Sequence, residues 1–177
     1  MAGPPVPARP DGFLRGPSDA QVQIEFFFDL MCPNCRDAWP GVRGMFEHFE
    51  NATQRQLRAG RPASDHAPTV SIRLHLFPLP YHHNAYLVAQ GATALGTADE
   101  PQVWKWMEAV FAEQDQFGNP ATDRMTAQEV REALVKLASR HHLDSNALAE
   151  GLRSTQADGN TRVSWKYACY RGVFGTP

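Results

Sequence analysis

The sequence predicts a mixed α/β domain in which a strand–helix–strand unit leads into a block made only of helices. Residues 22–28 form an apolar run rich in phenylalanine, which is typical of a buried strand. Residues 69–77 alternate between aliphatic side chains and a second set that includes serine, arginine and histidine, which predicts another strand. Residues 84–171 show helical patterns and no strand pattern. Together these observations predict a βαβ unit followed by a large all-helical insertion.

Composition narrows the class of protein. The chain has 177 residues, of which 42% are hydrophobic, and a net charge of −2. That size suits one globular domain with its own core, and the near-neutral charge gives no reason to expect nucleic acid or an anionic membrane as a partner. No run is long and apolar enough to cross a bilayer. These features do not determine the oligomeric state.

Changes in composition divide the chain into four parts. Pro, Gly, Asp and Ser dominate the N-terminal stretch, which predicts an extended lead-in with no element of its own. The strand–helix–strand half follows, and its helix over 36–50 contains Pro40, where we expect a kink. The helical insertion and a short terminal loop complete the chain. The four parts cover residues 1–20, 21–80, 81–171 and 172–177.

Start and stop signals divide the insertion into separate helices. Pro101 suits the first turn of one helix, and Thr126 with Glu129 forms the pattern of a capping box at the start of another. The helices expected from these and similar signals cover 84–95, 103–117, 126–141, 144–153 and 160–171.

A Cys-Pro-Asn-Cys motif stands where the first strand meets its helix, and this arrangement is typical of thioredoxin-like redox proteins. Cys32 would lie at the first helical turn, where free N–H groups and the helix dipole favour a thiolate. Cys35 comes one turn later on the same face. We therefore predict that Cys32 is the exposed, attacking nucleophile and Cys35 the shielded, resolving thiol. Pro33 suits the first turn, and Pro33 and Asn34 together tune the redox potential.

Two other interpretations of the motif remain open. A Cys-x-x-Cys pair can be half of a zinc site, but Cys169 stands alone and the histidine pairs at 82–83 and 141–142 lack the usual ligand spacing. The pair could also be a structural disulfide that never turns over. We favour the redox interpretation, which requires neither a metal nor an organic cofactor.

Three segments carry a resemblance to a known family. They are the Phe-Phe-Phe-Asp-Leu-Met-Cys-Pro-Asn-Cys-Arg-Asp-Ala-Trp-Pro run, the His-Leu-Phe-Pro-Leu-Pro-Tyr-His-His-Asn-Ala run and the final Trp-Lys-Tyr-Ala-Cys-Tyr-Arg-Gly-Val-Phe-Gly-Thr-Pro run. The chain from Gly12 onward resembles the DsbA-like branch of the thioredoxin superfamily, and within it a plant and algal group. The resemblance implies a thioredoxin-like fold and disulfide exchange with cysteine-containing polypeptides.

The resemblance also gives a role to the last two residues. In that superfamily the proline of Thr-Pro is cis and lies beside the dithiol, so Thr176 and Pro177 would bind the backbone of a substrate peptide. A β-hairpin and a last helix then complete the family fold. Because the sequence stops at Pro177, we expect a fold that lacks these elements, as in a fragment, a truncated isoform or a chain cut for lack of order.

One position departs from the family pattern. Thioredoxin and DsbA carry a buried carboxylate six residues before the first cysteine, where this sequence has Phe26. Glu25 should face the opposite side of the strand. Asp29 matches an aspartate of other DsbA-like subgroups, and it could accept a proton from Cys35 or cap the active-site helix. We favour capping.

Four further residues have competing interpretations. His82 or His83 would favour a thiolate if it lay near Cys32, although histidines at such positions more often face solvent. Trp39 is better explained by packing than by substrate contact. Cys169 is expected to be a buried, inert thiol on an apolar helix face, with a third redox partner as the alternative.

Two other functional classes compete with disulfide exchange. One is a peptide-binding thioredoxin-fold module without turnover. The other is a glutathione-dependent enzyme similar to the kappa-transferase and isomerase group, which typically has Ser at the nucleophile position. The N-terminal residues show no apolar signal core. DsbA-like proteins nevertheless act in oxidising compartments, so the resemblance favours a mature form from the secretory pathway, the ER lumen or the extracellular space.

Overall fold

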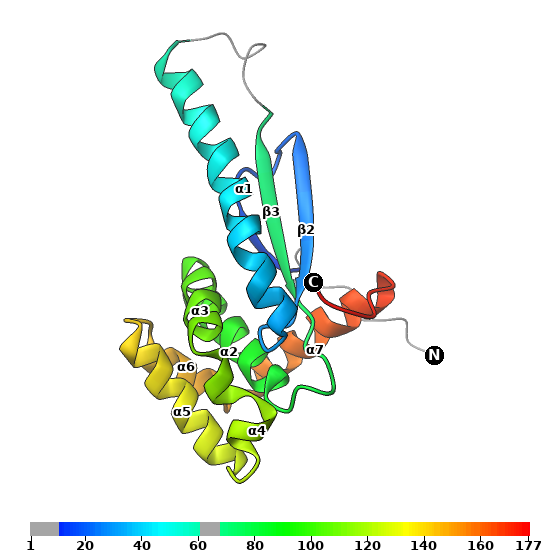
Figure 1. Cartoon of the computed structure of the whole chain (residues 1–177), viewed down its shortest axis with the longest axis vertical. Helices are drawn as coiled ribbons and strands as arrows, with labels where there is room; N and C mark the ends of the chain where they lie inside the picture. The colour runs from blue at the N-terminus through cyan, green and yellow to red at the C-terminus, as the bar shows by residue number, and fades with distance from the viewer. Residues whose placement is uncertain (1–10, 61–67) are drawn as a thin grey trace.

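A computed structural model describes residues 11–60 and 68–177 of the chain. Its sheet lies beside one long helix, and shorter helices gather at one end of both (Figure 1). The last helix, α7, lies next to the end of the sheet, and the segment that follows it turns back and brings the C-terminus to the start of the long helix. Among the described residues, no helix is both long and apolar enough to cross a bilayer.

The sheet has three strands in the order β1-β3-β2. Strand β2 (Val22–Phe28) pairs in parallel with the central strand β3 (Val70–Leu76). Strand β1 (Phe13–Arg15) pairs with β3 in the antiparallel direction. The structure therefore confirms the two predicted strands. It corrects the expected burial of the first, because only Phe28 of β2 is fully buried.

Strand β1 corrects the prediction that residues 1–20 contain no element. It is only three residues long, and glycines with positive φ flank it, Gly12 at +86° and Gly16 at +100°. A Cβ atom at either glycine would lie 2.7 Å from a carbonyl oxygen of β3. Glycine at these positions lets a short strand approach the sheet closely, and so short a run carries no periodicity to detect. Residues 1–10 lie outside the described part.

Helix α1 (Pro33–Arg58) is longer than the predicted helix over 36–50. Its second half contains two Glu, two Gln and two Arg residues, which are good helix formers, and Arg55 and Arg58 lie in the last turn. Gly60, with φ of +62°, follows the end of the helix. Pro40 lies inside the helix and does not end it.

The insertion consists of helices, as predicted. The Thr126–Glu129 capping box is present with both reciprocal hydrogen bonds. The last helix begins at Thr155 and not near residue 160, because the Ser154 hydroxyl caps its first turn and Gly159 lies within it. The elements are α2 (Ala85–Ala98), α3 (Pro101–Ala112), the 3₁₀ helix η2 (Gln114–Phe117), α4 (Asn119–Thr122), α5 (Ala127–Arg140), α6 (Ser145–Gly151) and α7 (Thr155–Tyr170).

Strand β3 is buried on both faces, so its alternation separates two apolar clusters. Leu74 and Leu76 belong to the main core, which also contains the dithiol and residues of α2, α3, α5 and α6. A smaller cluster on the other side contains Phe77 and Leu79 with Ala168 of α7. The dithiol therefore lies where the sheet meets the helical insertion.

A buried polar network fixes α7 against the sheet. His75 is fully buried between the rings of Phe27 and Tyr167, with centroid distances of 4.6 and 5.3 Å. Its Nδ1 lies 2.7 Å from Oδ2 of Asp11, and the same oxygen accepts a hydrogen bond from the Ser164 hydroxyl at 3.0 Å. These contacts hold the helix that leads into the C-terminal loop.

Candidate active site

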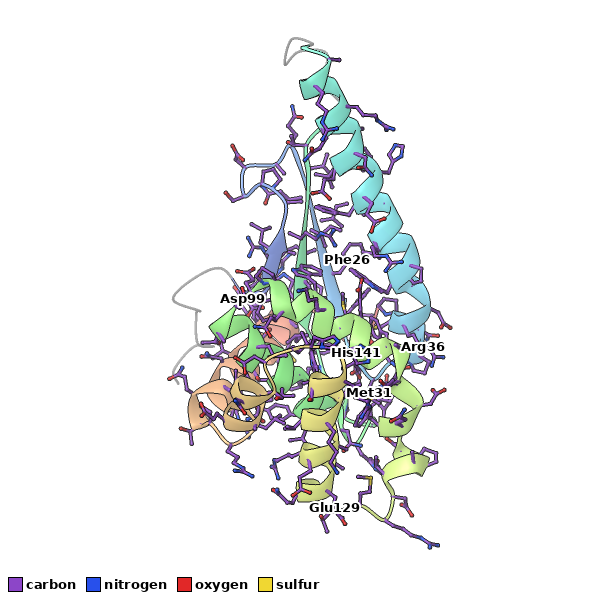
Figure 2. All side chains as sticks on the ribbon, turned by 90° about the vertical axis from the view of Figure 1, so that its left-hand side faces the viewer. Phe26, Met31, Arg36, Asp99, Glu129 and His141 are labelled. Atoms are coloured by element: carbon purple, nitrogen blue, oxygen red, sulfur yellow. The ribbon has the colours of Figure 1, made fainter. Side chains whose placement is uncertain are left out.

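The two cysteines of the motif lie at the N-terminus of α1. Cys32 precedes the helix, and its carbonyl oxygen accepts a hydrogen bond from the Cys35 N–H at 3.1 Å. Cys32 is only 5% exposed, which corrects the prediction of an exposed nucleophile, whereas Cys35 is fully buried as predicted. Both are free thiols. Met31 and Arg36, which flank the pair, lie at the end of α1 that faces the helical insertion (Figure 2).

The environment of Cys35 strongly favours its neutral form. Burial is the largest influence and raises the pKa of the Cys35 thiol from 9.0 to about 12. The Thr176 hydroxyl and the Asp29 backbone N–H lower this pKa, whereas the Cys32 sulfur raises it. Cys35 is therefore a protonated, shielded thiol at neutral pH. Cys32 has the position at the helix N-terminus that stabilises an anion.

The C-terminal loop brings Thr176 to the dithiol. The Cys32 Sγ lies 3.8 Å from the Thr176 carbonyl oxygen, although 144 residues separate them in sequence. The Thr176–Pro177 peptide bond is cis, as the resemblance implied. The Thr176 hydroxyl is buried without a hydrogen bond of good geometry among the described residues. Its effect on Cys35 therefore comes from proximity.

Asp29 is a buried carboxylate that connects the active-site loop to the loop after β3. Its Oδ1 accepts a hydrogen bond from the Met31 N–H at 2.8 Å, and its Oδ2 accepts one from the Leu79 N–H at 3.1 Å. The Nδ1 of His82 contacts the same Oδ2. Within the described residues, this carboxylate bonds neither an amide of α1 nor Cys35. Neither predicted role of Asp29, helix cap or direct proton acceptor, matches these contacts.

Phe26 and Glu25 of β2, which precede Asp29, face opposite sides of the strand, as predicted. Phe26 packs edge-to-face on Phe28 in the main core, with ring centroids 5.7 Å apart. Glu25 lies on the other face, where it pairs with Arg171 at 2.8 Å. The position of the family carboxylate is therefore apolar in this chain.

Gln114 contacts the active-site loop from the insertion, and sequence analysis did not select it. Its buried side-chain amide donates to the carbonyl oxygens of Leu30 at 2.9 Å and Cys32 at 3.1 Å. The adjacent Asp115 forms an ion pair with Arg36 at 3.0 Å. A lone glutamine at the end of a helical pattern gives no signal of such a role, because its partners lie more than eighty residues earlier.

Comparison with known proteins agrees with the geometry of this dithiol site. The family model described as thioredoxin matches residues 8–164. The chain belongs to this family. Solved structures share the fold at low sequence identity, and the mixed α/β fold with its helical insertion is therefore thioredoxin-like.

Two solved structures share this fold, and one curated protein is related in sequence, all at low identity. A putative protein-disulfide isomerase from Pseudomonas syringae has a TM-score of 0.72 at 17% identity, over 94% of this chain and 84% of that one. DsbA2 from Pseudomonas aeruginosa has a TM-score of 0.61 at 20% identity, over 98% and 79%. The Na(+)/H(+) antiporter NhaA 3 of Salinispora tropica is 26% identical over 173 residues. The chain covers 22% of that antiporter's length, and the match covers 97% of the chain.

The predicted tryptophan and histidines of this thioredoxin-family chain differ in burial and in their contacts. Trp39 is buried and stacks on Trp104 at 6.1 Å, which supports packing. His82 is partly buried on Asp29, whereas His83 is exposed and only its backbone N–H bonds to Asn119. Among the described residues, no cluster of three or more His, Cys, Asp or Glu side chains could hold a metal ion.

The prediction that Cys169 is buried is wrong. The thiol is exposed, because α7 turns Ala168 and the residues three to four positions apart from it toward the core. Cys169 follows Ala168 by one residue, which rotates it about 100° around the helix. The stripe of small residues that packs inward comprises Ala157, Thr161, Ser164 and Ala168.

We expect Gln114→Leu to destabilise the protein by about 1–3 kcal/mol, because two buried carbonyl groups lose their donor. Denaturant unfolding of the reduced protein measures this change in the free energy of unfolding. The matched control is Gln116→Leu on the same 3₁₀ helix, where the side chain is exposed and a change within about 0.5 kcal/mol is expected. Equal values for the two variants would contradict the assigned contacts.

Proposed function

We propose that this protein is a thiol–disulfide oxidoreductase that acts on cysteine-containing polypeptides. In the reducing direction, the Cys32 thiolate attacks a substrate disulfide, forms a mixed disulfide and releases one substrate thiolate, which takes up a proton. Cys35 then loses its proton and attacks the Cys32 sulfur, which releases the second substrate thiol and leaves a Cys32–Cys35 disulfide. Oxidation of a substrate dithiol follows the same steps in reverse.

The observation that carries this proposal is the inequality of the two thiols. Cys32 stands at a helix N-terminus within 3.8 Å of a backbone carbonyl, and Cys35 is fully buried with a pKa raised to about 12. A resolving thiol needs shielding until the mixed disulfide forms, and burial gives Cys35 that shielding, whereas Cys32 lies at the helix N-terminus beside the Thr176 carbonyl. The exposed backbone near Thr176 supports binding of an extended peptide by main-chain hydrogen bonds.

A redox titration tests the proposal. The purified chain is equilibrated in glutathione buffers of graded potential, free thiols are alkylated, and each cysteine is quantified by peptide mass. We expect one two-electron transition shared by Cys32 and Cys35, with Cys169 outside it. A pair that stays oxidised below about −300 mV would indicate a structural disulfide instead. Independent modification of the three cysteines would show that the dithiol does not act as a unit.

We expect Thr176→Val to slow the step in which Cys35 resolves the mixed disulfide. The Thr176 hydroxyl lowers the pKa of Cys35, so its removal raises that pKa further and leaves less thiolate at a given pH. Because this hydroxyl acts without a hydrogen bond of good geometry, its loss predicts a decrease of at most about fivefold, the value that corresponds to roughly 1 kcal/mol for a complete hydrogen bond. Acid quenching and mass analysis give the lifetime of the mixed disulfide.

The pH dependence of this step has a definite sign. Because Cys35 has a pKa of about 12, the resolution rate should rise with pH throughout the range from 7 to 10 and reach no plateau there. Thr155→Val, at an exposed position of α7, serves as the control for Thr176→Val. A plateau near pH 8 would mean that Cys35 ionises far more easily than its burial implies.

A further inference from the structure

A groove lies between the loop that follows β3 and helix α7. Its volume is about 370 Å³, and both elements lie next to each other near the C-terminal end of the sheet (Figure 1). The loop contributes Pro78, Leu79 and Pro80, and the helix contributes Arg162, Trp165 and Lys166. The three helical residues share one face because they are spaced three and four apart.

The groove is lined by ionisable side chains of the Arg, Lys and His type, all of which are basic. They are Arg162, Lys166 and the two histidines 82 and 83, and no carboxylate is among the lining residues. Arg162 is already paired with Asp158 at 2.7 Å, one turn earlier on α7. Lys166 has no ion pair within the part of the chain that the structure describes, and it is exposed. The groove therefore presents an unpaired cation.

The same groove has an apolar floor. Trp165 is 38% exposed and stacks on the buried Phe77 ring, with centroids 6.1 Å apart and an interplanar angle of 11°. An aromatic ring that is fixed by stacking on a buried ring offers a flat, rigid contact surface for an apolar or aromatic side chain. The prolines at 78 and 80 have no N–H groups that a ligand would leave unpaired.

Two contacts connect the groove to Asp29 in the active-site loop. Leu79, which lines the groove, donates its N–H to the Asp29 carboxylate, and His82 contacts the same carboxylate. Leu79 also belongs to the small apolar cluster on which Val173 packs, in the segment that leads to Thr176. A polypeptide bound at Thr176 can therefore extend toward the groove.

We propose that this groove binds a segment of the substrate polypeptide in which an apolar or aromatic side chain stands next to a carboxylate. The aromatic side chain lies on Trp165, and the carboxylate pairs with Lys166. This inference rests on the proposed disulfide exchange, because it assigns a specificity site to the same substrate. The unpaired cation beside an apolar floor is the observation that selects an acidic segment over a basic one.

The test uses the full chain and three peptides that differ at one residue. Each peptide carries one disulfide and, several residues away, Trp-Glu, Trp-Gln or Trp-Lys. We expect kcat/KM to follow the order Glu, Gln, Lys, with a three- to tenfold range at low ionic strength, since an exposed ion pair contributes up to about a fivefold effect. The range should shrink in about 0.5 M salt.

Two charge-reversal variants separate the effect of the groove on peptide preference from the effect of the protein's overall charge. Lys166→Glu should abolish or invert the order of the three peptides. Lys136→Glu, an exposed lysine on α5, makes the same charge change away from the groove and should keep the wild-type order. Calorimetry with disulfide-free versions of the peptides measures binding directly, so the comparison does not depend on catalytic rates.

The possible outcomes distinguish the two proposals. If wild-type protein fails to exchange with oxidised glutathione, the disulfide-exchange function is wrong, and the groove loses its role in it. If wild-type protein exchanges with oxidised glutathione but treats all three peptides alike, the groove inference is overturned while the function stands. Identical peptide preferences in the Lys166 and Lys136 variants would overturn it as well.

Discussion

Replacing Cys32 with serine is expected to reduce disulfide exchange by roughly three orders of magnitude or more, to the uncatalysed background. A serine hydroxyl cannot act as a thiolate and cannot form the mixed disulfide. Cys32 is also the thiol beside the Thr176 carbonyl, so no other cysteine has the same relation to a bound peptide. Turnover of a peptide with one disulfide, monitored at several potentials, measures the loss.

The companion variant Cys35→Ser should behave differently. Its Cys32 can still attack, so a mixed disulfide with substrate accumulates and is resolved only by external thiol. Cys169→Ser is the matched control, because the Cys169 thiol is exposed on α7, away from the two cysteines of the motif. Equal loss in the Cys32 and Cys35 variants without a trapped intermediate would contradict the asymmetric roles. Trapping through Cys169 would instead favour a third redox partner.

The parts of the site that follow from local sequence could be predicted. The position of Cys32 and Cys35 follows from a buried strand that runs into a helix, since three residues of spacing place both thiols on one turn. Strand β3 is recognisable because its side chains alternate between two faces, and β2 is recognisable as an apolar run rich in phenylalanine. The proximity of Thr176 to Cys32 came from the family resemblance, and no pattern in the residues implies it.

The parts that were missed depend on contacts between distant residues. Gln114 gains its role only when η2, which follows α3, packs against Leu30 and Cys32. The exposure of Cys169 depends on the rotation of α7, and small residues such as Ala168 give a weak apolar stripe. Asp29 was recognised as important, but its partners come from the loop after β3, which periodicity cannot place beside it.

Asp29→Ala is expected to destabilise the protein by about 3–5 kcal/mol, because it leaves three donors near the dithiol without their acceptor. The carboxylate is 1% exposed and receives hydrogen bonds from the Met31 and Leu79 N–H groups, and His82 contacts it as well. Denaturant unfolding measures the loss. The control is Asp37→Ala, at an exposed carboxylate on α1, where a change within about 0.5 kcal/mol is expected.

The conservative variant Asp29→Asn tests what the carboxylate does for the reaction. An amide of the same shape retains one acceptor oxygen but replaces the other with a donor, which faces the Leu79 N–H or the Met31 N–H. We therefore expect an intermediate loss of stability. We also expect a slower exchange rate, because the active-site loop and the loop with Leu79 and His82 no longer share one anchor. Wild-type stability in Asp29→Asn would show that the negative charge contributes nothing, and that packing alone holds the two loops together.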